Sequence, residues 1–158
     1  MKVLKFGGTS VGSVESIRQI QQIIAQQSDD CVVVVSALGG ITDQLLHAAH
    51  LALQADDTYM EVYQTIRQRH LDMANALIDN MTTRQMLCHE LENILDELRS
   101  ILFGVHLVKD LSAKSEAAIV SYGEQLSSRI VTAALPGAVR KDSLQFIRTD
   151  HKQGQVLL

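Results

Sequence analysis

Hydrophobic residues in the first 36 positions follow two kinds of pattern, which together predict one structural unit. Apolar residues surround Lys5 in a short run at residues 3–6, which predicts a strand. Apolar residues then recur at three- and four-residue steps from about residue 14 to residue 27, which predicts an amphipathic helix. Residues 31–36 form an unbroken, mostly β-branched run, as expected of a strand buried on both faces of a parallel sheet. This order predicts a right-handed βαβ unit.

Helical patterns dominate the middle of the chain. After a helical pattern that reaches Leu53, two amphipathic stripes in residues 58–103 predict a helical hairpin, beginning at a Thr58–Glu61 capping box and ending at Gly104. We expect the hairpin to serve packing rather than chemistry. The first stripe contains Tyr63, Ile66, His70, Met73 and Leu77, and the second contains Leu87, Leu91, Ile94, Leu98 and Ile101.

A long helical pattern from residue 113 to residue 135 has Gly123 and Glu124 in its middle. Glycine inside a helix costs about 1 kcal/mol relative to alanine, so we expect Gly123 to allow a close approach. The pattern predicts a break at this point, with Glu124 at a helix start where the helix dipole favours its ionised form. Residues 138–141 and 155–158 are expected to form further strands.

Two glycine pairs, Gly7–Gly8 and Gly39–Gly40, each follow a predicted strand and precede a predicted helix. Adjacent glycines let backbone N–H groups approach a ligand, and a helix start offers free N–H groups. Ligands of open α/β sheets bind at the carboxyl ends of the strands, where both turns should lie. Lys5 could neutralise phosphoryl oxygens there. Two interpretations stay open: a phosphate site, or a tight strand-to-helix turn with a solvated lysine. Thr42 fits a helix N-cap as well as a ligand contact.

Composition and charge exclude several classes of function. The 158 residues are 46% hydrophobic but only 4% aromatic, and the formal net charge is −4, so nucleic acid is not an expected partner. With no apolar run of membrane-spanning length and no secretory leader, we expect a cytoplasmic protein without membrane contact. Cys31 and Cys88 form no CxxC pair and are interpreted as small core residues. His47 and His50 lack the carboxylate of an HExxH motif, so we expect no metal site.

Four segments, taken in order, resemble one family. They are KFGGTSV at residues 5–11, VVVVSALGGIT at 32–42, SYGEQLS at 121–127 and DSLQFIRTD at 142–150. The chain resembles the amino-terminal part of an aspartokinase, in the amino acid kinase superfamily, and is also similar to the kinase portion of the bifunctional aspartokinase–homoserine dehydrogenases. The resemblance implies an α/β fold, a three-layer αβα sandwich with a mainly parallel sheet. Residues 1–158 would be its amino-terminal, amino-acid-binding lobe.

The resemblance also implies an activity and a set of site residues. The activity is ATP-dependent phosphorylation of the side-chain carboxylate of L-aspartate to 4-phospho-L-aspartate, the first step of lysine, threonine and methionine biosynthesis, with Mg²⁺ carried by ATP. The aspartate carboxylate is already ionised at pH 7, so no general base is required. Residues implied to meet the phosphoryl group of ATP are Lys5, Gly7, Gly8, Thr9 and Ser10, and those implied to hold aspartate are Ser36, Thr42 and Glu124.

The chain departs from the family pattern because it ends before the Gly-Arg-Gly-Gly-Ser-Asp-type segment and the nucleotide lobe. We therefore predict that the isolated chain is catalytically inactive and binds ATP weakly. We also expect a homo-oligomer that buries either a sheet edge or the second hairpin stripe between subunits. Two alternatives stay open. One is a related kinase acting on glutamate, acetylglutamate or a nucleoside monophosphate; the other is a non-catalytic binding or assembly module that uses the hairpin as its interface.

Overall fold

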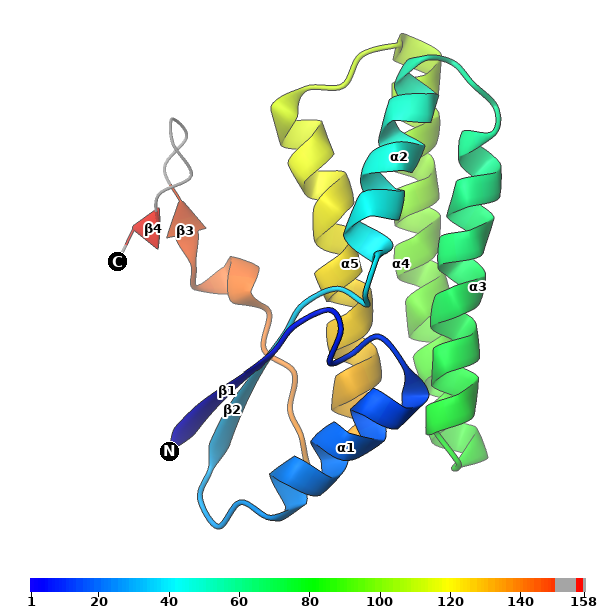
Figure 1. Cartoon of the computed structure of the whole chain (residues 1–158). Coiled ribbons are helices and arrows are strands. Elements are labelled where there is room, and N and C mark those ends of the chain that lie inside the picture. The colour runs from blue at the N-terminus through cyan, green and yellow to red at the C-terminus, as the bar shows by residue number, and fades with distance from the viewer. Residues whose placement is uncertain (150–155, 158) are drawn as a thin grey trace.

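A bundle of long helices and a short two-stranded ribbon make up the structure, a computed structural model that describes residues 1–149 and 156–157 (Figure 1). Asp150 of the fourth family segment, with Gln155 and Leu158 of the predicted last strand, lies outside the described residues. The elements are β1 (Lys2–Phe6), α1 (Val14–Ala25), β2 (Cys31–Val35), α2 (Ile41–Leu53), α3 (Tyr59–Leu77), α4 (Met81–Val108), α5 (Ala113–Ala134), the 3-10 helix Ser143–Gln145, β3 (Arg148–Thr149) and β4 (Val156–Leu157).

Strands β1 and β2 pair in parallel, with Lys2 opposite Cys31 and Phe6 opposite Val35, and α1 is the crossover between them. The predicted strand–helix–strand unit is therefore confirmed. The inner face of the ribbon packs against the hydrophobic core, but its outer face does not. Val32 and Val34 are 44% and 45% exposed. The prediction that the second strand is buried on both faces is wrong for this structure, because the helices of the described chain cover only one face.

Helix α1 begins as its sequence predicts. Ser13 is the N-cap, and its Oγ accepts a hydrogen bond from the backbone N–H of Ser16 at 3.1 Å. Ile17 and Ile20 are buried, so the apolar stripe faces the core. The helix ends at Ala25, two residues before the predicted end.

Helices α2, α3, α4 and α5 stand side by side and enclose the largest part of the core (Figure 1). The predicted hairpin is present as α3 and α4. All five residues of its first stripe are buried, and in the second stripe Leu87, Leu91, Ile94 and Leu98 are buried while Ile101 is half-buried. This stripe packs inside the chain itself, so the expectation that it lies between subunits is wrong. The sheet edge therefore remains the one predicted contact between subunits.

Several predicted helix ends lie elsewhere. Thr58 precedes α3, but its hydroxyl donates to Asp56 Oδ1 at 2.6 Å and caps nothing, so the capping box does not form. Gly104 does not end α4, which continues to Val108 and stops where Lys109 adopts a left-handed conformation with φ of 54°. One glycine costs too little to end a helix whose neighbouring turns are buried in a bundle.

Helix α5 runs without a break from Ala113 to Ala134, so the predicted interruption at residues 121–124 is wrong. Residues 138–141 form no strand, but β3 and β4 pair as a short antiparallel ladder, which confirms a strand near the end of the chain. None of the helices in the described part is both long and apolar enough to cross a membrane.

Candidate functional site

The first glycine turn starts where β1 ends, at Gly7. The N–H of Val11 donates to Gly7 O at 3.2 Å, and this compact loop leads into the N-cap of α1. Lys5 lies beside the loop, because a Cβ placed on Gly7 would be 3.7 Å from Lys5 Nζ. Thr9 and Ser10 are exposed on the same loop. The predicted proximity of the lysine to the glycine pair is confirmed, while its action on a phosphoryl group stays a prediction.

The second turn follows β2 directly. Ser36 extends the ribbon by one hydrogen bond, since its N–H donates to Phe6 O at 3.1 Å. Gly40 has a φ of 80°, a conformation that favours glycine, and it is the N-cap residue of α2. Thr42 is therefore the second residue of the helix, and the interpretation of Thr42 as the N-cap is wrong. Its half-buried side chain lies in the first turn of α2, close to Gly39 and Gly40.

The two glycine turns touch through their backbones. A Cβ on Gly8 would lie 3.1 Å from Ala37 O and 3.4 Å from Gly39 Cα, and a Cβ on Gly39 would lie 3.2 Å from Gly8 O. Within the first turn, a Cβ on Gly12 would lie 3.1 Å from Gly8 O, and it would lie 3.7 Å from Gly39 N of the second turn. Such contacts leave no room for side chains. The prediction that both turns lie at one edge of the sheet is confirmed, and the structure adds that they touch.

Backbone N–H groups are available where the turns meet. In residues 1–149 and 156–157, the N–H groups of Gly8, Thr9, Ser10, Gly39 and Gly40 donate to no acceptor. Unpaired N–H groups that converge at a turn can bind the oxygens of an anion, and a nearby ammonium group adds positive charge. The turns therefore have the donors that a phosphoryl group requires.

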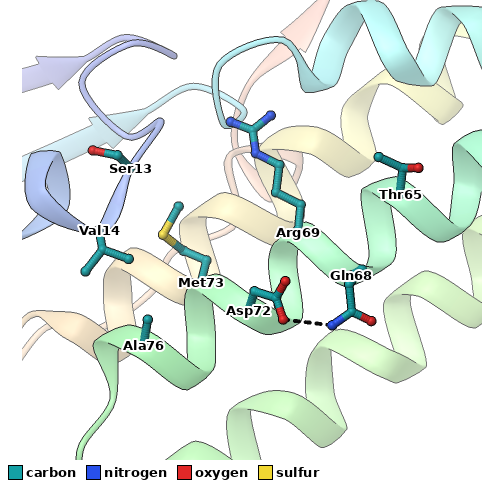
Figure 2. Close-up of a pocket in the computed structure, with 8 residues that line it drawn as sticks. All are labelled: Ser13, Val14, Thr65, Gln68, Arg69, Asp72, Met73 and Ala76. Atoms are coloured by element: carbon teal, nitrogen blue, oxygen red, sulfur yellow. Dashed lines mark hydrogen bonds between the residues drawn. The ribbon is translucent and has the colours of Figure 1, made fainter.

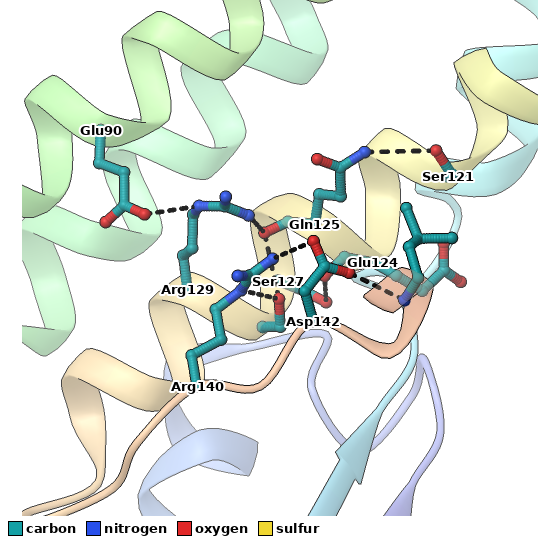
Figure 3. A network of polar contacts seen from close by, with 10 residues as sticks. Glu90, Ser121, Glu124, Gln125, Ser127, Arg129, Arg140 and Asp142 are labelled. Atoms are coloured by element: carbon teal, nitrogen blue, oxygen red, sulfur yellow. Dashed lines mark hydrogen bonds and ion pairs between the residues drawn. The ribbon is translucent and has the colours of Figure 1, made fainter. Parts of the chain in front are cut away.

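Helix α5 brings a carboxylate to the second turn (Figure 3). Glu124 Oε1 accepts a hydrogen bond from the N–H of Ala37 at 3.3 Å, and Ser127 Oγ donates to Ser36 O at 2.7 Å. Glu124 is thus held beside Ser36, as the family resemblance implied. It lies in the middle of α5 rather than at a helix start, so an amide hydrogen bond, not a helix dipole, supports its carboxylate.

Gly123 explains how α5 comes so near. A Cβ at this position would lie 2.7 Å from Ala37 Cβ, a distance that real Cβ atoms do not tolerate. The predicted close approach is confirmed, and it is made to the second glycine turn.

Gly123→Ala should therefore destabilise the chain although alanine is the better helix former. Overpacking costs about 1–3 kcal/mol, and a Cβ only 2.7 Å from another Cβ belongs to the upper part of that range, about 2–3 kcal/mol. About 1 kcal/mol of helix propensity offsets part of this cost, so we expect a net loss of roughly 1–2 kcal/mol. Gly104→Ala is the matched control, because a Cβ there meets nothing within 4 Å and should stabilise α4. Urea unfolding of both variants measures the difference. Equal stabilisation by both substitutions would contradict the close contact.

Arg69 is a site component that sequence reasoning missed. It extends from α3 toward both turns (Figure 2), donating from Nη1 to Gly39 O at 2.6 Å and from Nη2 to Gly12 O at 3.3 Å. The residues share no sequence motif, since Arg69 is 30 positions from Gly39 and 57 from Gly12. The only sequence signal was a basic residue on a helix that was assigned to packing.

The helical bundle also carries histidine and tyrosine side chains. His50 Nε2 lies 3.1 Å from Glu116 Oε2, and the part of the chain that the structure describes holds no group of three or more His, Cys, Asp or Glu side chains placed to bind a metal. Burial raises the pKa of Tyr122 above its usual value, and the nearby carboxylate of Glu97 adds to this effect. The Tyr122 phenol therefore stays neutral at physiological pH.

The fold and the paired turns agree with the comparisons to known proteins. The chain belongs to the amino acid kinase family, which matches residues 1–156. Within that family it is similar to aspartokinases. Aspartokinase 2, chloroplastic, of Arabidopsis thaliana is 32% identical over 137 residues, which are 84% of this chain and 24% of that protein. Bifunctional aspartokinase/homoserine dehydrogenase 1, chloroplastic, of the same plant is 27% identical over 157 residues, or 99% of this chain and 17% of that protein.

A solved structure shows the same fold. Aspartokinase III of E. coli superposes with a TM-score of 0.73 at 23% sequence identity, covering 85% of this chain and 28% of that protein. That enzyme was solved with lysine and aspartate and, separately, with aspartate and ADP. The chain spans 17–28% of the length of these relatives. The implied amino acid kinase fold is confirmed.

Proposed function

We propose that this chain is the amino-acid-binding lobe of an aspartate kinase, and that the complete enzyme phosphorylates the side-chain carboxylate of L-aspartate with ATP. The observation that supports this most directly is the contact between Gly8 and Gly39 beside Lys5 and Glu124. At this contact, the free N–H groups of the turns and the ammonium group of Lys5 are suited to bind a phosphoryl group. The carboxylate of Glu124 lies next to them and is suited to bind the α-ammonium group of an amino acid. The names of the similar proteins favour aspartate as the acceptor.

In this proposal the residues divide into two groups. One aspartate carboxylate oxygen attacks the γ-phosphorus of ATP, the bond to the bridging oxygen breaks, and ADP leaves. Lys5 and the N–H groups of the first turn stabilise the phosphoryl oxygens, with Mg²⁺ arriving on the ATP phosphates. Glu124 accepts from the ammonium group of aspartate. The residues assigned to the phosphoryl group are Lys5, Gly7, Gly8, Thr9 and Ser10, and those assigned to aspartate are Ser36, Thr42 and Glu124.

We also propose that the contacts to ATP are divided between two lobes of the complete enzyme. The described residues offer the glycine turns for the terminal phosphates, and we assign the adenine contacts to a separate nucleotide lobe of the complete enzyme. The isolated chain is accordingly expected to be inactive and to bind ATP weakly. A cytoplasmic location and a homo-oligomer joined through the sheet edge also stay predictions.

A substrate panel on the complete enzyme tests the proposal. ATP consumption should occur with L-aspartate, and hydroxylamine should trap the acyl phosphate product. Glutamate, acetylglutamate and nucleoside monophosphates should give no more than background turnover. Turnover of any of these with none of aspartate would overturn the aspartate assignment while leaving a kinase of the same family.

A non-catalytic assembly module is the alternative from another class. It would use the α3–α4 hairpin as its interface, yet Leu87, Leu91 and Leu98 on that hairpin are buried within the chain. The observed packing therefore favours the enzyme. Normal function of the complete protein in cells after Lys5→Ala would favour the module instead.

A further inference from the structure

We propose that Arg69 is a positioning residue that fixes the distance between the two glycine turns, and hence between the phosphoryl group and its acceptor. The effect of Arg69 on catalysis rests on the proposed kinase function. The pair of hydrogen bonds by which Arg69 joins the two turns, called the clamp below, can be tested without activity. The hydrogen bonds of Arg69 to the two turns are made to their backbones and not to their side chains. It binds one backbone carbonyl of each turn, Gly12 O and Gly39 O.

The guanidinium group is suited to this link because its N–H donors form a rigid planar fork. With Nη1 on one turn and Nη2 on the other, neither turn can shift without breaking a charge-assisted hydrogen bond. Neighbouring polar residues on α3 do not compete for it. Gln68 Nε2 donates to Asp72 Oδ1 at 2.7 Å, and Figure 2 shows Arg69 extending away from this pair toward the turns.

The link also orients peptide groups. In a planar trans peptide the N–H points opposite to the C=O, so the N–H groups of Gly40 and Ser13 point away from Arg69. Neither of these N–H groups donates to an acceptor among residues 1–149 and 156–157. A carbonyl that accepts from a cation is polarised, which strengthens the donor at the other end of the same peptide.

The positive charge of Arg69 is not neutralised locally. In the described part of the chain Arg69 forms no ion pair, whereas Arg67, two residues earlier on the same helix, is paired with Glu92. A cation without an ion-pair partner among the described residues favours anionic ligands nearby. Here the cation lies on the side of the turns opposite to the free N–H groups of Gly40 and Ser13, so it favours an anion at those N–H groups. Arg67 is thus a matched control: it has the same chemistry and lies on the same helix, but it contacts α4 rather than the turns.

The first test measures the clamp in the chain itself by amide hydrogen exchange. Arg69→Met should speed exchange at least tenfold at Val11 and Ile41, whose N–H groups bond within the first and second turns. Arg67→Met should leave both amides unchanged. Unchanged exchange in Arg69→Met would overturn the inference, whatever reaction the enzyme catalyses.

The second test uses the complete enzyme and separates positioning from stability. Since misplacement by about 1 Å can cost 100-fold in rate, Arg69→Met should lower kcat by roughly 30- to 100-fold with the KM for aspartate changed less than threefold. Arg69→Lys, which keeps the charge and can reach one carbonyl, should recover part of kcat. Assays well below the Tm of each variant remove any contribution from unfolding. A kcat for Arg69→Met within twofold of wild type would overturn the inference, while an unmutated enzyme inactive on aspartate would overturn only the proposed function.

Discussion

Lys5→Ala should lower kcat for aspartate phosphorylation by about 100-fold or more in the complete enzyme, with little change in the KM for aspartate. Charge on the phosphoryl oxygens redistributes as the bond to ADP breaks, so an ammonium group beside them stabilises the transition state more than the ground state. The proposed mechanism gives this role to Lys5, whose Nζ would lie 3.7 Å from a Cβ placed on Gly7. Steady-state kinetics with both substrates varied measures the two parameters.

Two further substitutions make that result specific. Glu124→Ala should instead raise the KM for aspartate by roughly 10- to 100-fold, because a hydrogen bond to a charged group contributes about 1.5–3 kcal/mol. Lys2→Ala is the control, since Lys2 lies on the same strand but binds Gln27 Oε1 at 3.0 Å. Equal and small effects of Lys5→Ala and Glu124→Ala would show that the site lies elsewhere.

The stability of the chain should depend on pH through His70, which is fully buried in α3. Burial lowers its pKa from 6.5 to about 4, the charge of Arg69 acts in the same direction, and the hydrogen bond to Ile66 O opposes them. The unfolded chain therefore binds an extra proton between these two values. The free energy of unfolding should fall as the pH drops from about 7 to about 4, by roughly 3 kcal/mol from this residue.

Urea unfolding at pH 7.5 and at pH 4.5 measures this effect. His70→Leu removes the titrating group and should lose less stability over the same pH interval than wild type. His50→Gln, at an exposed histidine paired with Glu116, should behave like wild type. Identical pH profiles for wild type and His70→Leu would show that folding does not lower the pKa of His70.

Local patterns predicted most of the helices and strands and the common sheet edge of the two turns. The stripe from Val14 placed α1 within two residues at its end, and the pattern from residue 113 to residue 135 matched α5 closely. Paired glycines after parallel strands predicted that both turns lie at one edge of the sheet, because strand direction alone brings them there. The direct contact of Gly8 with Gly39 was found only in the structure. The sequence also indicated the candidate residues Lys5, Thr9, Ser10 and Thr42, because they lie close to these turns along the chain.

Features that depend on tertiary packing were not predictable in the same way. Gly104 resembled a helix stop, yet bundle packing carries α4 past it to Val108. Val32 and Val34 had the composition of a doubly covered strand, but burial depends on which elements lie opposite. Arg69 was missed because its acceptors are backbone carbonyls, which leave no trace in the sequence.

Glu124 and Ser127 meet their partners across 87 and 91 residues of sequence, and this separation has a consequence for biosynthesis. A ribosome releases both glycine turns long before α5 has been made. The turns cannot reach their final geometry until α5 docks, since Gly123 and Glu124 pack directly on the second turn. Closing such a long loop is a slow, non-local step compared with forming each helix. The nascent chain should therefore acquire its helices early and the geometry of its candidate site last.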